Sequence, residues 1–366
     1  MADDWDSDEP IERDVPPPVG TEFEVDEGGI GEEATEGVEA LEGGLSAEAL
    51  VEVGKVGAEA ASASRRYEQA VRQCRTSADR VLDRMALPAV DAAWSAALGP
   101  YERAMRQVFS GRLSDMVQPG DTNRLLQQTE LLLRPYREAL RAYHGTQRVI
   151  AAEGLRSVED FWRQVAQQSS SLENVQTHAR LVEMQIRHAT QSRLVHENQL
   201  VGRVPVEIGQ KLLQFEIKGV NVREFVGRAA DLTEDQWWQM ERLVRTETSR
   251  AYNQAQSDAI AEIATTTPGI WKRWTELVDD WSGSPFDNKV AKDSLVLHGQ
   301  VARVNGSFTM PPDQRAPAVM VGKTWAQPPN RPNDRAVLTP WMREWGIPAW
   351  AWQGTKVWLS GSNARA

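Results

Sequence analysis

The chain has a single cysteine, Cys74, and no long apolar run. One cysteine excludes an intramolecular disulfide framework and a cysteine-rich zinc site. No apolar segment reaches the roughly 18–20 residues that a transmembrane helix needs. The N-terminus is acidic, unlike the positively charged start of a signal peptide. We therefore expect neither a disulfide scaffold nor a contact with a membrane.

The short motifs of the common enzyme classes are also missing. The sequence contains no P-loop, no G-x-S-x-G turn and no H-E-x-x-H helix. His178, His188 and His196 are ten and eight residues apart, which does not match the i, i+3 or i+4 spacing of ligands on one helix face. The sequence therefore predicts a protein that is not an enzyme and that has no metal or other cofactor.

Charge is distributed unevenly along the chain. The formal net charge is −11, but residues 1–42 contain sixteen acidic residues and one arginine, so the rest of the chain is mildly basic. High charge, few aliphatic residues and the prolines of residues 16–18 predict a disordered tail over residues 1–44. A solvating tail is the simpler interpretation, and a strip that docks on a basic partner during assembly is the alternative.

Residues 45–231 have the composition and apolar spacing of long amphipathic helices. Such helices need partners to bury their apolar stripes, so we expect an elongated helical bundle or a homo-oligomer. We expect a new helix to start at Ser157. Chain breaks are predicted at residues 87–88, 99–100, 118–121, 145 and 202–205.

Arginine is dense in the first of these helices. An arginine-rich face is typical of phosphate contacts, but aromatic residues do not interleave with the arginines, which favours an ordinary solvated helix surface. The candidate DNA contacts are Arg65, Arg66, Arg72, Arg75, Arg80 and Arg84.

The composition changes near Leu232, since eleven of the fourteen tryptophans lie from Trp237 onward. Thr233 and Gln236 have the spacing of a capping box, so a long helix is expected to start there and to run to Ala264. Strands are predicted at 270–278 and, more weakly, at 300–304 and 318–321. The predicted fold class is α+β: an elongated, mostly helical N-terminal region followed by a small domain, 232–340, with one long helix and a short antiparallel sheet.

The order of motifs in this second domain is distinctive. Residues 245–253 read R-T-E-T-S-R-A-Y-N, and tryptophans, an acidic pair, H-G-Q-V and P-N-D-R follow. This order resembles the C-terminal domain of tailed-phage minor head proteins, the Mu F-type head-morphogenesis family. The matching residues are Arg245, Thr246, Glu247, Tyr252, Asn253, Asp279, Asp280, Gly299, Phe308, Pro332, Asn333 and Arg335.

The chain departs from the family in three places. His298 stands where the family has an aspartate, Ser294 stands at a histidine position, and the closing block lacks the family's histidine and cysteines. A metal or redox role of those groups is therefore not carried over to this chain.

The resemblance implies a structural minor capsid protein of a tailed phage or prophage that acts in head assembly near the portal. Its partners would be the portal or other head proteins and phage DNA during packaging or ejection. It would be made in the bacterial host cytoplasm and built into the virion. One alternative is a DNA-binding packaging accessory protein. A second is a toxin or ADP-ribosyltransferase-type enzyme, as in relatives that carry such a domain after this module, but residues 341–366 are too few for one.

Three groups of residues invite a functional interpretation. We expect Glu247 and Asn253 to bond backbone groups of the sheet as structural locks, with Glu247 also paired to Arg250. Asp279 and Asp280 are expected to form a turn. The C-terminal extension, 341–366, is rich in aromatic residues, which is typical of interaction surfaces. Its candidate docking residues are Trp341, Trp345, Trp350 and Trp352.

Overall fold

The computed structural model describes residues 47–276, 292–331, 334–352 and 356–358. The chain divides into two compact units, Met1–Lys55 and Val56–Ala366. The described elements form a mostly helical α+β structure with a small antiparallel sheet, which confirms the predicted fold class. The predicted acidic tail, 1–44, lies outside the described residues.

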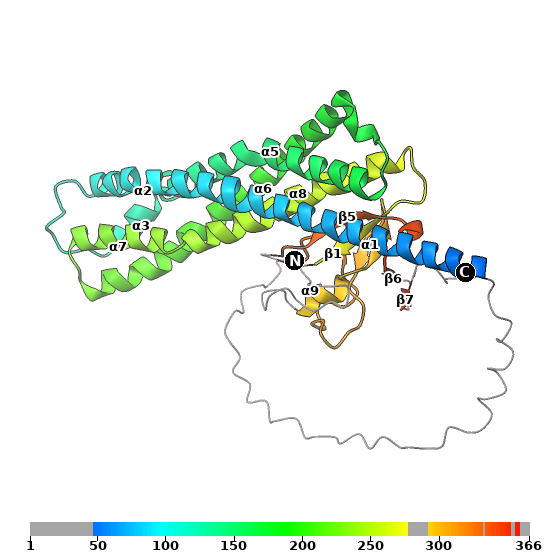
Figure 1. Ribbon diagram of the computed structural model, residues 1–366. Helices are drawn as coiled ribbons and strands as arrows, with labels where there is room; N and C mark the ends of the chain where they lie inside the picture. The colour runs from blue at the N-terminus through cyan, green and yellow to red at the C-terminus, as the bar shows by residue number, and fades with distance from the viewer. Residues whose placement is uncertain (1–46, 277–291, 332–333, 353–355, 359–366) are drawn as a thin grey trace, which may run out of the picture. The chain divides into compact units, whose positions relative to one another are not determined.

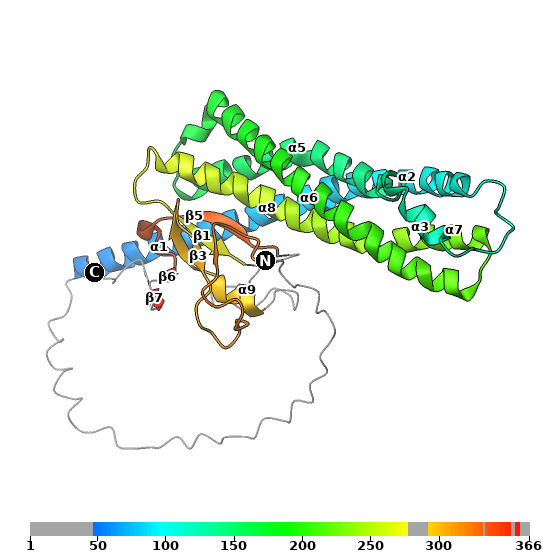
Figure 2. The same cartoon turned by 180° about the vertical axis from the view of Figure 1, so that it is seen from behind.

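The helices make up most of the second unit. The element α1 (Ala47–Val81) continues through the π-helix η3 (Leu82–Ala86) into α2 (Leu87–Val108). Four longer helices follow, α5 (Arg134–Val165), α6 (Val175–Lys218), α7 (Val222–Glu234) and α8 (Trp237–Ala264). Shorter elements are α3 (Asp121–Leu126), α4 (Thr129–Leu132), η4 (Ser171–Glu173), α9 (Lys292–Leu297) and η5 (Arg343–Trp345). Helix α5 packs against α2, α6 and α8, as Figures 1 and 2 show from opposite sides.

Most of the predicted helix breaks are wrong. Pro88 lies where η3 passes into α2, and the helical run continues through it without a break. Pro100 and Pro205 lie inside α2 and α6, and Gly145 lies inside α5. The bundle explains this tolerance: the neighbouring Tyr101 and Val204 are fully buried, so packing of these helices outweighs the local cost of the breakers.

The two predicted helix starts are also corrected. Ser157 lies in the middle of α5, where it is buried. Thr233 belongs to the end of α7, and its Oγ1 bonds back to the carbonyl of Ala229 instead of capping α8. A second bond, to the hydroxyl of Tyr101 at 2.9 Å, holds Thr233 against α2. The long helix therefore begins at Trp237.

The main sheet has three strands in the order β2-β1-β5, all antiparallel. Strand β1 (Trp271–Thr275) is central, between β2 (Val301–Arg303) and β5 (Val337–Trp341). Two small hairpins accompany it, β3 (Phe308–Thr309) with β4 (Thr324–Trp325), and β6 (Trp350–Trp352) with β7 (Lys356–Trp358).

Two of the three predicted strands coincide with observed ones, β1 and β2. The third, 318–321, is wrong because the segment forms a turn. The amide of Met320 donates to the carbonyl of Pro317, and the amide of Lys323 donates to that of Met320. Val319 and Val321 face solvent in this turn, so their β-branched side chains do not take part in a sheet.

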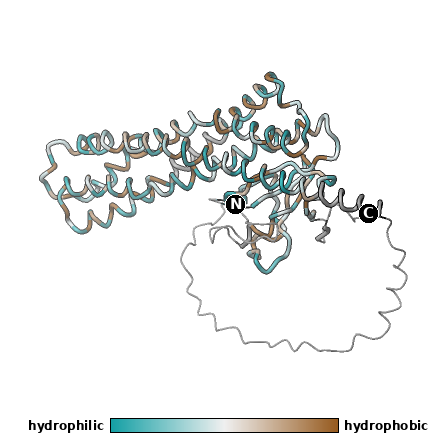
Figure 3. The backbone as a smooth tube through the Cα atoms, viewed as in Figure 1, coloured by the Kyte–Doolittle hydropathy of each residue, from teal (hydrophilic) through white to brown (hydrophobic). Residues whose placement is uncertain are grey.

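Apolar residues gather in three clusters, and hydrophobic and hydrophilic stretches alternate along the helices that carry them (Figure 3). One cluster fills the bundle and includes Trp94 and Tyr252. A second joins Trp162 of α5 to Trp274 and Leu338 of the sheet. Residues before and after Leu232 therefore share their cores. Among the described residues, no helix is long and apolar enough to cross a membrane.

Candidate functional site

Asn253 joins the long helix to the sheet, as predicted. Its Oδ1 accepts a hydrogen bond from the amide of Leu338 at 2.8 Å, and its Nδ2 donates to the carbonyl of Ala336 at 3.0 Å. Gln256, one turn further along α8, also accepts from the amide of Leu338, at 3.2 Å. All three bonds are buried, so Asn253 acts as a positional lock between α8 and β5.

The neighbouring motif residue Tyr252 binds α1 instead. Its hydroxyl donates to the carbonyl of Cys74 at 2.9 Å in the buried core. Arg335, at the other end of the motif region, donates to Asp79 of α1 at 2.7 Å. These motif residues tie α8 and the strand region to the N-terminal helix, so their roles are structural.

Three other motif residues, Arg245, Thr246 and Glu247, lie on α8. Arg245 pairs with Glu241 at 3.0 Å and reaches Asp83 of η3 at 3.5 Å, while Thr246 bonds back to the carbonyl of Arg242. Glu247 pairs with Arg250, as predicted. Glu247 lines a pocket together with residues of α5 and α6, whereas Asn253 and Gln256 bond the strand region.

Gly299 and Phe308 are packed against the centre of the sheet. Gly299 has φ +78°, and a Cβ there would lie 3.4 Å from the Arg273 guanidinium, so both backbone and space favour glycine. Phe308 is fully buried and meets the Trp274 ring edge to face at 5.3 Å. Asp279, Asp280, Pro332 and Asn333 lie outside the described residues.

Strand β1 carries buried charged groups that the sequence analysis does not single out. Lys272 and Arg273 are both buried, and Lys272 Nζ donates to the carbonyl of Ala326 at 2.6 Å. Burial lowers the pKa of Lys272 to about 8, against the opposing attraction of Asp258. Adjacent side chains of a strand point to opposite faces, so two neighbouring cations predict that at least one face of the strand is exposed to solvent. In the tertiary structure both faces of β1 are covered, and both cations are therefore buried.

His298 lies in the turn before β2, beside the end of β1. Its Nδ1 accepts a hydrogen bond from the amide of Glu276 at 3.1 Å, and its carbonyl accepts from the Trp350 indole at 2.9 Å. Burial, together with the positive charges of Arg273 and Arg75, holds the pKa of His298 well below its usual value. The imidazole is therefore neutral at physiological pH and serves as a hydrogen-bond acceptor.

The arginines of α1 and η3 do not form a continuous basic face. Arg65, Arg72, Arg80 and Arg84 are exposed, whereas Arg66 and Arg75 are half-buried. Arg80 pairs with Glu153 at 3.3 Å, and Arg66 donates to Ser62. Within the described residues, Arg65, Arg72 and Arg84 form no ion pair, and they are the arginines that remain available to phosphate.

The tryptophan cluster is mainly core, which corrects the predicted docking surface. Trp341 and Trp350 are buried because β5 and β6 pack into the sheet and against the helices. Their indoles donate to the carbonyls of Ile347 and His298. Trp345 is half-buried against Trp162, and Trp352 is half-buried in β6.

A pocket of about 340 Å³ lies between α5, α6 and α8, and we call it the three-helix pocket. Its polar lining includes Tyr143, Gln147, Gln185, His188, Glu247 and Arg250. The hydroxyl of Tyr143 is buried and lies beside Thr248 and Gln147. Burial first, and then the Glu247 carboxylate, raise the pKa of Tyr143, so this phenol stays protonated. The described residues contain no group of three or more His, Cys, Asp or Glu side chains that could hold a metal ion.

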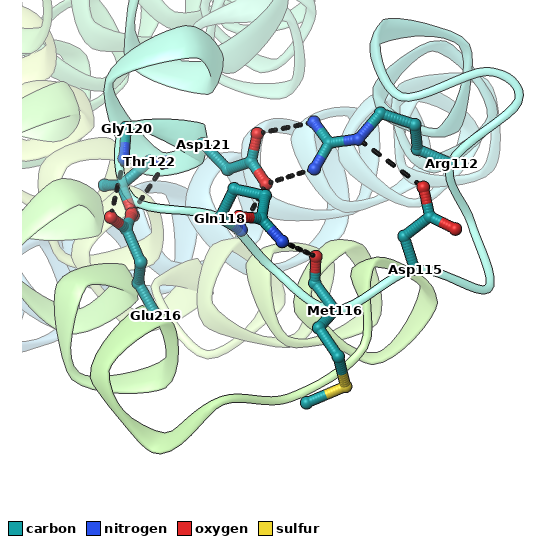
Figure 4. Close-up of polar contacts among 8 residues, drawn as sticks. All are labelled: Arg112, Asp115, Met116, Gln118, Gly120, Asp121, Thr122 and Glu216. Carbon is teal, nitrogen blue, oxygen red and sulfur yellow. Dashed lines mark hydrogen bonds and ion pairs between the residues drawn. The ribbon is translucent and has the colours of Figure 1, made fainter.

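A second polar cluster fixes the loop between α2 and α3 (Figure 4). Asp121 accepts two hydrogen bonds from Arg112, at 2.9 and 3.1 Å, and one from the amide of Gln118 at 2.8 Å. Burial alone would raise the pKa of Asp121, but these donors outweigh it and lower the pKa.

Glu216 of α6 completes this cluster from the opposite side (Figure 4). Its carboxylate accepts hydrogen bonds from the amides of Gly120 and Thr122, at 2.8 and 3.0 Å. It thereby accepts hydrogen bonds from amides at the start of α3, which have no partner within the helix. Glu216 is nearly a hundred residues away in the sequence, so no local pattern predicts this contact. The Arg112, Asp121 and Glu216 cluster is a structural lock.

Comparison of the chain with protein-family models, with curated proteins and with solved structures finds no match.

Proposed function

We propose that this chain is a structural minor capsid protein of a tailed phage or prophage that acts in head assembly near the portal. The order of motifs between Arg245 and Arg335 supports this proposal. The observation that carries it is the placement of Tyr252, Asn253 and Arg335, which all bind other elements of the fold. Motif residues that hold elements of the fold together are consistent with a structural protein that is built into a larger assembly.

An exposed apolar strip on α6 supports docking onto such an assembly. Val206, Leu213 and Ile217 recur at helical spacing on one face of α6, and Ile217 is 85% exposed. Met116, on the adjacent loop, is also exposed. Contiguous exposed apolar residues are typical of protein interaction sites, so we propose this α6 strip as the surface that contacts the portal or another head protein.

The proposal is tested by particle composition. The chain should be present in heads purified from the phage or prophage that encodes it, and deletion of its gene should reduce the yield of filled heads. In this proposal the protein is located in the bacterial host cytoplasm during assembly and in the virion afterwards. Absence of the wild-type chain from purified heads would overturn it.

A DNA-binding packaging accessory protein is the second candidate. The exposed side chains of Arg65, Arg72 and Arg84 favour it, because each is available to neutralise a phosphate. If these residues contact DNA, replacing all three by glutamine should weaken binding and reduce the salt dependence of log K by about 0.9 per lost phosphate contact. Arg106, which is exposed but paired with Glu102 on α2, offers a matched control.

A further inference from the structure

The three-helix pocket combines one buried charge with neutral hydrogen-bonding groups. The Glu247 side chain is 8% exposed, whereas its partner Arg250 is 51% exposed. The fixed charge inside the pocket is therefore the carboxylate, and the guanidinium lies at the edge next to solvent. An anion entering the pocket would face Glu247, while a cation would be attracted to it.

The other polar groups suit a cation with several N–H donors. Gln147 offers an acceptor oxygen, and the buried Tyr143 hydroxyl lies beside it. An alkylammonium group carries three donors and no acceptor, which matches a carboxylate with neighbouring oxygen atoms. The ring of Tyr143 also favours a nearby cation electrostatically.

The remaining lining is aliphatic and the space is small. Ala189, Val195 and Ala251 line the pocket beside the polar groups. Its volume of about 340 Å³ is at the lower end of the roughly 300–1,000 Å³ that is usual for ligand pockets. A short methylene chain fits this volume and this aliphatic lining.

We propose that the three-helix pocket binds a primary alkylammonium group, with Glu247 as its anionic acceptor and Arg250 as a resident cation that the ligand displaces. The entering ammonium replaces the half-exposed guanidinium as the partner of the buried carboxylate, so Glu247 is not left unpaired and Arg250 moves into solvent. The group comes either from a free diamine or from a lysine side chain of another protein. This inference does not depend on the proposed role in head assembly.

Calorimetric titration of the full chain tests the proposal with two probes. One is 1,5-diaminopentane and the other is Nα-acetyl-lysine N-methylamide, so the two sources of the ammonium group are distinguished by which probe binds more tightly. Saturable binding of either probe is expected. Replacing Glu247 by glutamine should weaken it by about tenfold or more, the usual effect of losing a charged hydrogen-bond partner.

Glu262→Gln is the matched control, because it removes the same charge from the same helix, where Glu262 pairs with Arg180. Any non-specific attraction of the amines to the acidic residues 1–42 is the same in the two variants and cancels. Arg250→Gln should bind the probe more tightly than wild type, since it removes the competing cation.

Two results would overturn the proposal. One is the absence of saturable binding of both probes by the wild type and by Arg250→Gln. The other is equal affinity of Glu247→Gln and Glu262→Gln. If Glu247→Gln fails to fold, as judged by its circular dichroism melt, the Arg250→Gln comparison decides the question alone.

Discussion

Asn253 Oδ1 accepts the amide hydrogen of Leu338 at 2.8 Å, and this buried bond joins α8 to β5 across 85 positions of the chain. The same side chain returns a hydrogen bond to Ala336, so one residue satisfies two backbone groups of the strand region. Both would be left without these partners if the carboxamide were removed.

We therefore predict that Asn253→Ala destabilises the protein by about 1–3 kcal/mol, the usual cost of leaving buried polar groups unpaired. Urea unfolding followed by circular dichroism measures this change. Glu241→Ala removes only the surface pair with Arg245 and should cost less than about 1 kcal/mol. Equal effects of the two substitutions would contradict the assignment of Asn253 as a lock.

Trp350 is a core residue in this structure, with 2% of its surface exposed. Trp350→Ala should therefore lower stability by about 3–5 kcal/mol, because it leaves a cavity and breaks the bond to the carbonyl of His298. Trp238 is 53% exposed, and its replacement by alanine should change stability by about 0.5 kcal/mol or less. Thermal denaturation of both variants is the measurement, and a mild effect at Trp350 would restore the docking interpretation.

Lys272 gives the protein a specific pH dependence. Its folded pKa, about 8, is lower than its ordinary value of 10.5, so the unfolded state binds more protons between these two pH values. The contribution of Lys272 to stability should therefore rise as the pH increases from about 8 to 10.5, by at most about 1.4 kcal/mol per pH unit.

The difference in unfolding free energy between wild type and Lys272→Met isolates this contribution. Tyr101 and Cys74, whose pKa values burial raises to about 12, affect both proteins equally. Urea titrations at several pH values between 7 and 10 provide the data. A difference that stays constant over this range would contradict the lowered pKa of Lys272.

The α6 strip can be separated from the fold by substitution at its exposed positions. Leu213 and Ile217 are 45% and 85% exposed, so changing both to serine should alter stability by only about 0.5 kcal/mol each. If the strip docks on the head, the variant should be incorporated several-fold less, because anchors at interface centres contribute about 2 kcal/mol or more. Quantification of the chain in purified particles tests this, with Lys211→Ser, an exposed position on another face of α6, as control.

The sequence predicts the α+β class, the helical content and the central strand because these follow from local periodicity. The spacing of apolar residues over 45–231 requires helices, and the tryptophans and β-branched residues after Gly269 favour a strand. Asn253 could be assigned as a lock since it is a polar residue within the buried stripe of a helix. The other contacts of the site could not be predicted from the sequence, because the spacing of apolar residues in a helix does not identify the element that packs against each of its faces.

Tertiary packing decided what local signals left open. Pro100 and Pro205 are accommodated because the surrounding bundle buries both helices, which offsets the bonds that the prolines cannot make. Glu247 faces the three-helix pocket, and Trp341 and Trp350 are buried, because elements distant in the sequence cover those faces. The sequence by itself determined the fold class, the helical content and the central strand. The contacts between distant elements determined which polar and aromatic side chains are core, which are locks and which remain available to a partner.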